Sequence, residues 1–174
     1  SVVFGGFASN ELASRIDDSK AKLLVTASCG FEPGRTVEYK PLVDEAIKIA
    51  NHKIDKMILF QRPGHEVKLI APNEVSWEEV VSNAKDADCV EINSNEFAYI
   101  LYTSGTTGTP KGIVRDIGGH IVALKWTMKN IYNIDTDDIW WSASDIGWIV
   151  GHSYIVYAPL FKGCTTVLFE GKPV

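Results

Sequence analysis

The chain has 174 residues, of which 45% are hydrophobic and 22% charged, the composition of an ordinary globular protein with a sizeable core in one domain. Its net charge of −5 supplies no general basic field, so we expect no nucleic-acid partner. No apolar run approaches the ~18 residues that a membrane span requires, so we expect no membrane partner.

Helix-like and strand-like segments alternate along the first half of the chain. One helix is predicted from Ser9, whose side chain can cap it, and a second near residues 41–51. Their apolar stripes are, in chain order, Leu12, Ala13, Ile16, Leu42, Ala46 and Ile49. Strands are predicted over 23–26 and 57–60. Proline–glycine pairs predict turns at 32–35 and 62–64.

A third helix is predicted to begin at Ser76. Ser76 and Glu79 have the spacing of a capping box, in which each side chain satisfies a backbone donor of the other residue. Helical spacing then predicts a buried stripe made of Trp77, Val80, Ala84 and Ala87.

The second half continues the alternation, with strands predicted over 97–102, 112–115, 139–141 and 165–169. A helix of about four turns is indicated by apolar residues at steps of four and three; these are Ile117, Ile121, Leu124, Met128 and Ile131. The nearly all-apolar run from Trp148 to Phe161 predicts a buried helix. This order of elements is typical of an α/β fold with a mostly parallel sheet and flanking helices.

Cysteine and aspartate spacing give no sign of a metal site. Cys29, Cys89 and Cys164 form no Cys-x-x-Cys or histidine-paired motif, so we expect reduced thiols in a reducing compartment. The aspartates at 86–88 and 135–138 lack EF-hand spacing and are interpreted as parts of solvated loops.

The most distinctive segment is Thr103–Gly112, which follows the apolar run 97–102 and reads Thr-Ser-Gly-Thr-Thr-Gly-Thr-Pro-Lys-Gly. Glycines let backbone N–H groups approach an anion, hydroxyls donate further hydrogen bonds, and a lysine adds a charge. The segment is neither a Walker A motif nor Gly-x-Gly-x-x-Gly, because Lys111 is followed by glycine and Gly105 and Gly108 are three apart. We therefore predict a polyphosphate-binding loop of another kind, with an ordinary solvated loop as the alternative.

Residues 102–112 resemble the signature loop of the adenylate-forming enzymes, which include acyl-CoA synthetases, luciferases and peptide-synthetase adenylation domains. Residues 1–9 and 144–154 are similar to the short-chain branch, the acetyl- and propionyl-CoA synthetases, and 157–160 and 165–171 extend the match. Asp145–His152, together with Arg115-Asp116, looks closer to the propionyl-CoA synthetases.

The resemblance implies roles for the residues of the loop. Lys111 would be the catalytic residue and contact the β- and γ-phosphates of ATP, unless it is a solvated surface lysine. The other expected phosphate-binding residues are Thr103, Ser104, Gly105, Thr106, Thr107 and Gly108. Thr109 stands where many relatives carry a lysine, so this site would have one cation fewer.

The resemblance also implies an acyl pocket and a CoA site. Trp148, Ile149 and Val150 would line a small apolar slot for the acid, unless they are simply core residues. Val150 would also approach the CoA thiol, and an apolar residue there, where acetyl-type relatives carry threonine, favours propionate.

The remaining CoA-binding residues implied by the resemblance are Gly6, Glu32, Pro33, Gly34 and Arg35. The pair Gly5-Gly6 would let CoA approach the backbone, and Arg35 would pair with a phosphate. Glu32 stands where acetyl-type relatives carry a second arginine, which puts tight 3′-phosphate binding in doubt. A plain solvent-exposed turn at 32–35 is the alternative.

Two histidines, His120 and His152, are candidate catalytic groups. A Ser-His-Asp hydrolase would need Gly-x-Ser-x-Gly, which the chain lacks. His152 is therefore interpreted as a satisfied core histidine, and His120 is placed at the start of the long helix.

The chain is thus interpreted as residues 1–174 of the large N-terminal domain of a propionyl-type acyl-CoA synthetase, cut at both ends and lacking the small C-terminal domain. This acid–thiol ligase would join a short carboxylate to CoA with ATP through an acyl-adenylate. Mg²⁺ would be bound mainly outside the segment, which alone would be inactive. A mitochondrial matrix or cytosolic location is expected. The alternatives are acetyl-CoA synthetase, another adenylate-forming enzyme, or a non-catalytic nucleotide- or CoA-binding module.

Overall fold

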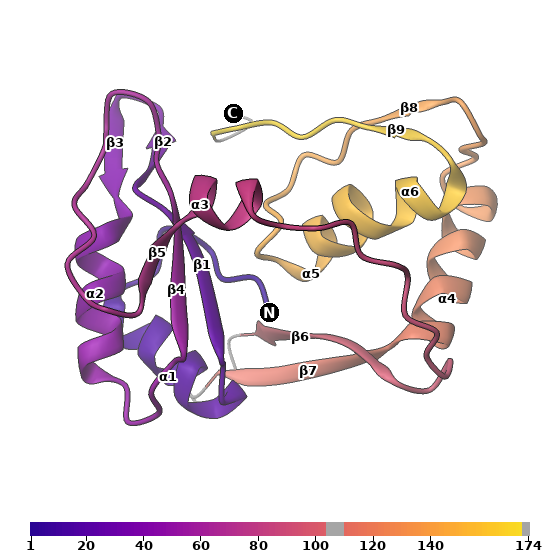
Figure 1. Ribbon diagram of the computed structural model, residues 1–174. Coiled ribbons are helices and arrows are strands. Elements are labelled where there is room, and N and C mark those ends of the chain that lie inside the picture. Colours follow the sequence, from indigo (N-terminus) through magenta and orange to yellow (C-terminus); the bar gives the residue numbers. More distant parts are fainter. Residues whose placement is uncertain (104–109, 172–174) are drawn as a thin grey trace. The chain divides into compact units, whose positions relative to one another are not determined.

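The computed structural model describes residues 1–103 and 110–171, and the chain divides into two compact units (Figure 1). One unit is Gly5–Asp88, and the other combines Ser1–Phe4 with the described residues from Cys89 onward. The composition predicted a sizeable core, and among the described residues each unit contains a packed apolar cluster. The predicted α/β fold is confirmed.

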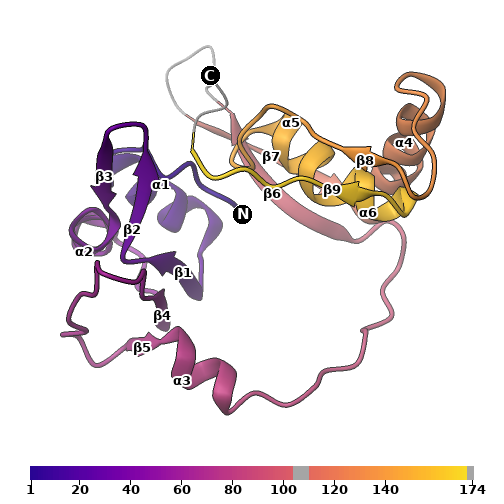
Figure 2. The same ribbon diagram turned by 90° about the horizontal axis from the view of Figure 1, so that it is seen from above.

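The first unit contains a parallel three-stranded sheet in the order β1-β4-β5 and an antiparallel hairpin, β2–β3. Its elements are α1 (Ser9–Ser19), β1 (Leu23–Ala27), β2 (Cys29–Glu32), β3 (Arg35–Glu38), α2 (Tyr39–Ile49), β4 (Lys56–Phe60), β5 (Glu74–Ser76) and α3 (Trp77–Ser82). The helices α1 and α2 pack against each other, and α2 contacts β1 (Figures 1 and 2).

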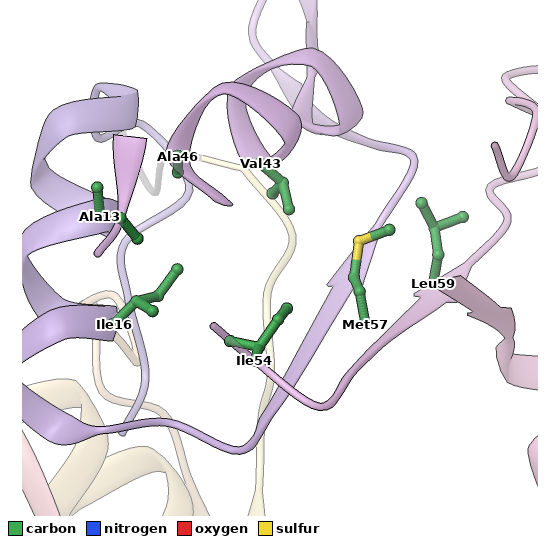
Figure 3. Packing of buried hydrophobic residues seen from close by; sticks show 8 residues of the cluster. Ala13, Ile16, Val43, Ala46, Ile54, Met57 and Leu59 are labelled. Carbon is green, nitrogen blue, oxygen red and sulfur yellow. The ribbon is translucent and has the colours of Figure 1, made fainter. Parts of the chain in front are cut away.

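The core of this unit lies between these two helices and one face of the sheet. Figure 3 shows Ala13 and Ile16 from α1, Val43 and Ala46 from α2, and Met57 and Leu59 from β4 around Ile54. Alternate residues of β4 are buried, as expected for a strand with one covered face. The other face of β1 leaves Leu23 56% and Val25 60% exposed.

Three helix predictions in this unit were partly wrong. The N-cap of α1 is Ala8, and Ser9 is already the first helical residue, so it does not cap the helix. In α2 the buried face runs through Val43 and Ala46, whereas Ile49 is 42% exposed.

The helix predicted after Ser76 is confirmed only at its start. The Ser76 hydroxyl accepts hydrogen bonds from the backbone N–H groups of Glu78 and Glu79. However, α3 ends at Ser82 and buries no residue, and Ala84 and Ala87 lie beyond it and are exposed. Trp77 instead meets the ring of Phe60 on β4, with the ring centroids 6.3 Å apart.

The second unit has two strand pairs and two helical stretches. Its elements are β6 (Phe97–Thr103), β7 (Lys111–Asp116), α4 (Ile117–Asn130), β8 (Ile139–Trp140), α5 (Ile149–Gly151), the π-helix η1 (His152–Tyr157), α6 (Ala158–Lys162) and β9 (Thr165–Thr166). The pair β6–β7 is antiparallel and β8–β9 is parallel. Figure 1 shows the α5–α6 stretch between the two pairs. Leu124 and Met128 of α4 pack with Ala158 and Cys164 in the core.

The apolar helix predicted from Trp148 to Phe161 contains a π-helical segment, which no pattern in its sequence predicts. A π-helix shifts the backbone hydrogen-bond pattern, and side chains from other elements bond to its carbonyls. The Trp140 indole Nε1 donates to the carbonyl of Tyr154 at 2.7 Å, and the Thr166 hydroxyl donates to that of Ile155 at 2.7 Å. In the described part of the chain, no helix combines the length and apolar character that crossing a membrane needs.

Candidate functional site

The ends of the predicted phosphate loop are held together by the β6–β7 pair. Thr103, the last residue of β6, is the register partner of Lys111, the first residue of β7, and Tyr102 is paired with Gly112. The other predicted loop residues, Ser104, Gly105, Thr106, Thr107, Gly108 and Thr109, lie outside the described residues. The strand pair therefore places Thr103 beside Lys111, and a phosphate site shared by the two residues stays a prediction.

The two end residues differ in exposure. Lys111 is exposed, which leaves its ammonium available to a ligand, and Thr103 is half-buried. Gly112 has a structural role, because a Cβ there would lie 2.9 Å from Cγ2 of Ile100 and 3.3 Å from the Tyr102 ring. A larger residue at 112 would disturb the strand pair that carries Lys111.

A tight turn positions the predicted acyl pocket. Oδ1 of Asp145 accepts a hydrogen bond from the N–H of Gly147 at 2.7 Å, and the carbonyl of Asp145 accepts one from Trp148 at 3.1 Å. Trp148 is the N-cap of α5, so the prediction that it lies within the helix was wrong by one residue. The carbonyl of Asp145 also packs so closely on Gly151 that a Cβ there would lie 1.9 Å from it.

The predicted pocket residues follow directly from this turn. Trp148 is 43% exposed and Val150 52% exposed, and Ile149 is half-buried. The Trp148 ring lies 6.0 Å from the ring of Phe4, measured between centroids. Exposure argues against the alternative that Trp148 and Val150 are core residues, and it leaves their apolar surface available to a ligand or to another part of the protein.

Behind the turn, His152 packs in an aromatic cluster. It is 5% exposed, its Nδ1 lies 3.2 Å from the carbonyl of Ile146, and its ring meets Tyr99 edge-on at 4.5 Å. Tyr157 stacks on Tyr99 at 5.5 Å, and the Tyr99 hydroxyl lies 3.2 Å from Nε2 of His120. His152 is therefore a satisfied core histidine, as predicted. Sequence reasoning missed Tyr99, which joins the strand leading to the phosphate loop to the helix carrying the pocket residues.

Burial lowers the pKa of His152 below the ordinary 6.5, although the contact with the carbonyl of Ile146 opposes the shift. The pKa of His120 is lowered in the same way by burial, and further by the charge of Arg115. The unfolded chain therefore binds more protons than the folded chain as the pH falls through about 6.5, and the folded state loses stability in that direction.

We expect the apparent unfolding temperature of the protein to fall as the pH is lowered from about 7.5 to 5.5, the range in which an unfolded histidine becomes charged. His152→Asn should reduce this pH dependence, because asparagine can still donate to Ile146 but does not titrate. Thermal melts across this range provide the measurement, with His65→Asn at an exposed position as the control. Equal pH dependence in wild type and His152→Asn would contradict the prediction.

The predicted CoA-binding turn is the tip of the β2–β3 hairpin. Pro33 and Gly34 form the two-residue connection, and Gly34 has a φ of 76°, which glycine adopts without strain. Arg35 contacts Glu32 across the turn, with Nη2 2.8 Å and Nε 2.9 Å from Oε2. Glu32 therefore occupies the guanidinium that we expected to bind phosphate. Such an exposed pair contributes only about 0–1 kcal/mol, so a phosphate could displace it.

The predicted CoA residues are divided between the units: Gly6 and Glu32–Arg35 belong to the first and Val150 to the second. Within the first unit, Gly5 of the Gly5-Gly6 pair also has a structural role. A Cβ on Gly5 would lie 2.3 Å from the hydroxyl of Tyr39, so Gly5 makes room for this side chain.

Comparison with known proteins shows the family to which the chain belongs. The family model described as "AMP-binding enzyme" matches residues 1–174. The chain belongs to the AMP-binding enzyme family.

Several members of the AMP-binding family are similar to the chain over its whole length. It is 56% identical to the mitochondrial acyl-CoA synthetase short-chain family member 3 of Homo sapiens, with 100% of this chain and 26% of that protein covered. It is 44% identical to acetyl-coenzyme A synthetase of Photobacterium profundum, with 99% of this chain and 27% of that protein covered. The chain thus spans about a quarter of the length of these relatives.

A solved structure confirms the AMP-binding fold. Acetoacetyl-CoA synthetase from Streptomyces lividans matches with a TM-score of 0.82 at 22% identity, covering 96% of this chain and 25% of that one. At this identity the likeness establishes the fold alone.

Proposed function

We propose that the chain is an internal segment of the large domain of a short-chain acyl-CoA synthetase. The whole enzyme would convert a short carboxylate, ATP and CoA into acyl-CoA, AMP and pyrophosphate. The observation that carries this proposal is the Thr103–Gly112 segment, with Thr103 and Lys111 paired at its ends, in a chain 56% identical to an acyl-CoA synthetase.

The reaction would proceed in two steps. A carboxylate oxygen attacks the α-phosphorus of ATP, the bond to the bridging oxygen breaks, and pyrophosphate leaves. The sulfur of CoA then attacks the carbonyl carbon of the acyl-adenylate, the bond to the phosphate oxygen breaks, and AMP leaves. The protein contributes mainly positioning and neutralisation of charge, for which an exposed Lys111 beside Thr103 is suited.

Mg²⁺ would add positive charge next to the phosphates. The described residues hold no group of three or more histidine, cysteine, aspartate or glutamate side chains that could bind a metal ion. Mg²⁺ binding mainly outside this chain, and a small C-terminal domain beyond it, are implied by the resemblance to the short-chain synthetases and form part of the proposal. The exposed Leu23 and Val25 support an internal segment, because parallel sheets are normally covered on both faces.

The segment alone should form no adenylate, and ATP-dependent acyl-CoA formation by the purified 174 residues would contradict this.

Propionate is the proposed acid, and the mitochondrial matrix the proposed location. The apolar Val150, two residues after Trp148, supports propionate over acetate, whereas the 44% identity to an acetyl-coenzyme A synthetase keeps acetate as the alternative. Similarity to mitochondrial relatives supports the location.

The test is carboxylate-dependent ATP–pyrophosphate exchange by the full-length protein that contains this chain, with acetate, propionate and butyrate side by side. Exchange measures adenylate formation without CoA. We expect the fastest exchange with propionate. Faster exchange with acetate would retain the enzyme class and reverse the substrate assignment. No exchange with any of the three would favour another acid, or a module that binds a nucleotide or CoA without catalysis.

Val150→Thr should lower the preference for propionate over acetate. Threonine has nearly the shape of valine but places a hydroxyl where the extra methylene of propionate would pack, which should cost about 1 kcal/mol, or roughly fivefold in relative kcat/KM. The measurement is kcat/KM for both acids in the exchange assay. Val122→Thr, at an exposed position on α4, is the matched control. An unchanged ratio in Val150→Thr would contradict the placement of Val150 in the acyl pocket.

A further inference from the structure

Tyr39 is the first residue of α2, and its hydroxyl lies against two glycines from different segments of the first unit. A Cβ on Gly5 would lie 2.3 Å from this hydroxyl, and one on Gly30 would lie 2.0 Å from it. Both distances are too short for any side chain. The two glycines therefore leave the space that the Tyr39 ring occupies.

Each of these glycines is next to a predicted CoA-binding segment. Gly5 is bonded to Gly6, and Gly30 lies on β2 two residues before Glu32, at the tip of the β2–β3 hairpin. Figure 1 shows this hairpin leading into α2, where Tyr39 begins the helix. One side chain thus contacts both segments.

The backbone of Tyr39 is fixed to the sheet. Its N–H donates to the carbonyl of Ser28 at 3.0 Å. Ser28 is 1% exposed, its N–H donates to the carbonyl of Phe60 at 2.9 Å, and its hydroxyl accepts from the N–H of Arg62 at 2.9 Å. The first turn of α2 is therefore tied to the end of β4.

The next residue, Lys40, anchors the same turn to β5. It is buried, and its ammonium donates to Asp44 at 2.6 Å and to Glu74 at 2.9 Å. Breaking a buried pair by removing one partner is strongly destabilising, so this turn is a rigid support. A ring on a rigid support that touches two backbone segments sets the spacing between them.

Phe7, which follows the Gly5-Gly6 pair, contacts α1. The guanidinium of Arg15 lies 4.6 Å from the centroid of the Phe7 ring, and Arg15 is bonded to Glu11 at 2.8 Å within α1. Residues 5–7 therefore contact both α1 and Tyr39.

We propose that Tyr39 is a positioning residue for CoA binding, because its ring sets the distance between the Gly5-Gly6 backbone and the hairpin tip that carries Glu32 and Arg35. The inference rests on the proposed function. Tyr39 does not touch the reacting atoms, so its loss should affect the second half-reaction, which uses CoA, and leave adenylate formation intact.

The experiment compares two assays on the full-length protein with Tyr39→Ala, Tyr39→Phe and Gly30→Ala. Propionate-dependent ATP–pyrophosphate exchange reports the first half-reaction, and acyl-CoA formation over a CoA titration reports the second. Tyr39→Ala and Gly30→Ala should raise the KM for CoA roughly tenfold or more, since misplacement of binding groups by about 1 Å can cost 10²-fold. Exchange should remain within about twofold of wild type. Tyr39→Phe, which lacks only the hydroxyl, should give a smaller rise.

The matched control is Ile49→Ala, at the exposed last residue of the same helix, which should leave both assays unchanged. An unchanged KM for CoA in Tyr39→Ala and Gly30→Ala would overturn the proposal, and so would a parallel fall in exchange, which indicates a general structural defect. If Tyr39→Ala does not fold and cannot be purified, the KM for CoA of Gly30→Ala and Tyr39→Phe tests the proposal in the same way. Absence of exchange in the wild type would instead reject the proposed function, so the two failures are distinguishable.

Discussion

Replacing Lys111 with alanine is expected to slow carboxylate-dependent ATP–pyrophosphate exchange by roughly ten- to a hundredfold, because a hydrogen bond to a charged group contributes about 1.5–3 kcal/mol and 1.36 kcal/mol corresponds to a factor of ten in rate. Lys111 begins β7 beside Thr103 and is exposed, so its ammonium is accessible to a phosphate. Loss of the charge would weaken the binding of ATP and the stabilisation of the departing pyrophosphate. The measurement is the rate of exchange over a titration of ATP.

Two further variants test the charge itself. Lys111→Arg keeps the positive charge and should retain more exchange than Lys111→Gln, which keeps much of the length without the charge. Lys125→Ala, an exposed lysine on α4, is the control and should behave as wild type. Full exchange in Lys111→Ala would mean that Lys111 is a solvated surface lysine, the alternative considered from the sequence.

Replacing Gly151 with alanine is expected to have the largest structural effect at this site. The new Cβ would lie 1.9 Å from the carbonyl oxygen of Asp145, a backbone atom that no rotamer change can move away. Overpacking of this kind typically costs about 1–3 kcal/mol and occasionally more, even though alanine in place of glycine would favour an exposed helix by about 1 kcal/mol. The turn that presents Trp148 and Val150 should shift, so carboxylate-dependent exchange should fall together with the apparent unfolding temperature.

Gly119→Ala on α4 provides the matched control for this glycine. There the nearest atom is the end of the Asp116 side chain, at 2.7 Å, which can rotate away at the cost of the N-cap bond to Gly119. This variant should lose little stability and keep its exchange activity. A Gly151→Ala protein that melts and adenylates like wild type would show that the turn can relax, and would contradict the close packing on Asp145.

Local patterns predicted several elements well. The strand at β4 and the helix α4 were found because a short apolar run and three-to-four spacing are properties of a short stretch. The cap at Ser76 was also found, since capping depends on residues within one turn. The buried stripe predicted behind this cap was wrong because burial needs a second layer, and α3 buries no residue.

The π-helical segment lay beyond sequence reasoning for the same reason. Its carbonyls accept hydrogen bonds from Trp140 and Thr166, which come from β8 and β9 on either side of it in the chain. A pattern within 148–161 cannot report partners that folding brings from elsewhere.

At the candidate site, the sequence by itself determined which binding groups are available, a hydroxyl- and glycine-rich segment with Lys111, and the family of the chain over 1–174. Only the tertiary structure decided how the supporting residues pair. It placed Arg35 against Glu32, buried His152 against Tyr99, and set Tyr39 between Gly5 and Gly30. The residue types of a ligand-binding loop are adjacent in the chain, so they can be read directly from the sequence. Contacts such as that of Tyr39 with Gly5 join residues far apart in the chain and exist only once the chain has folded.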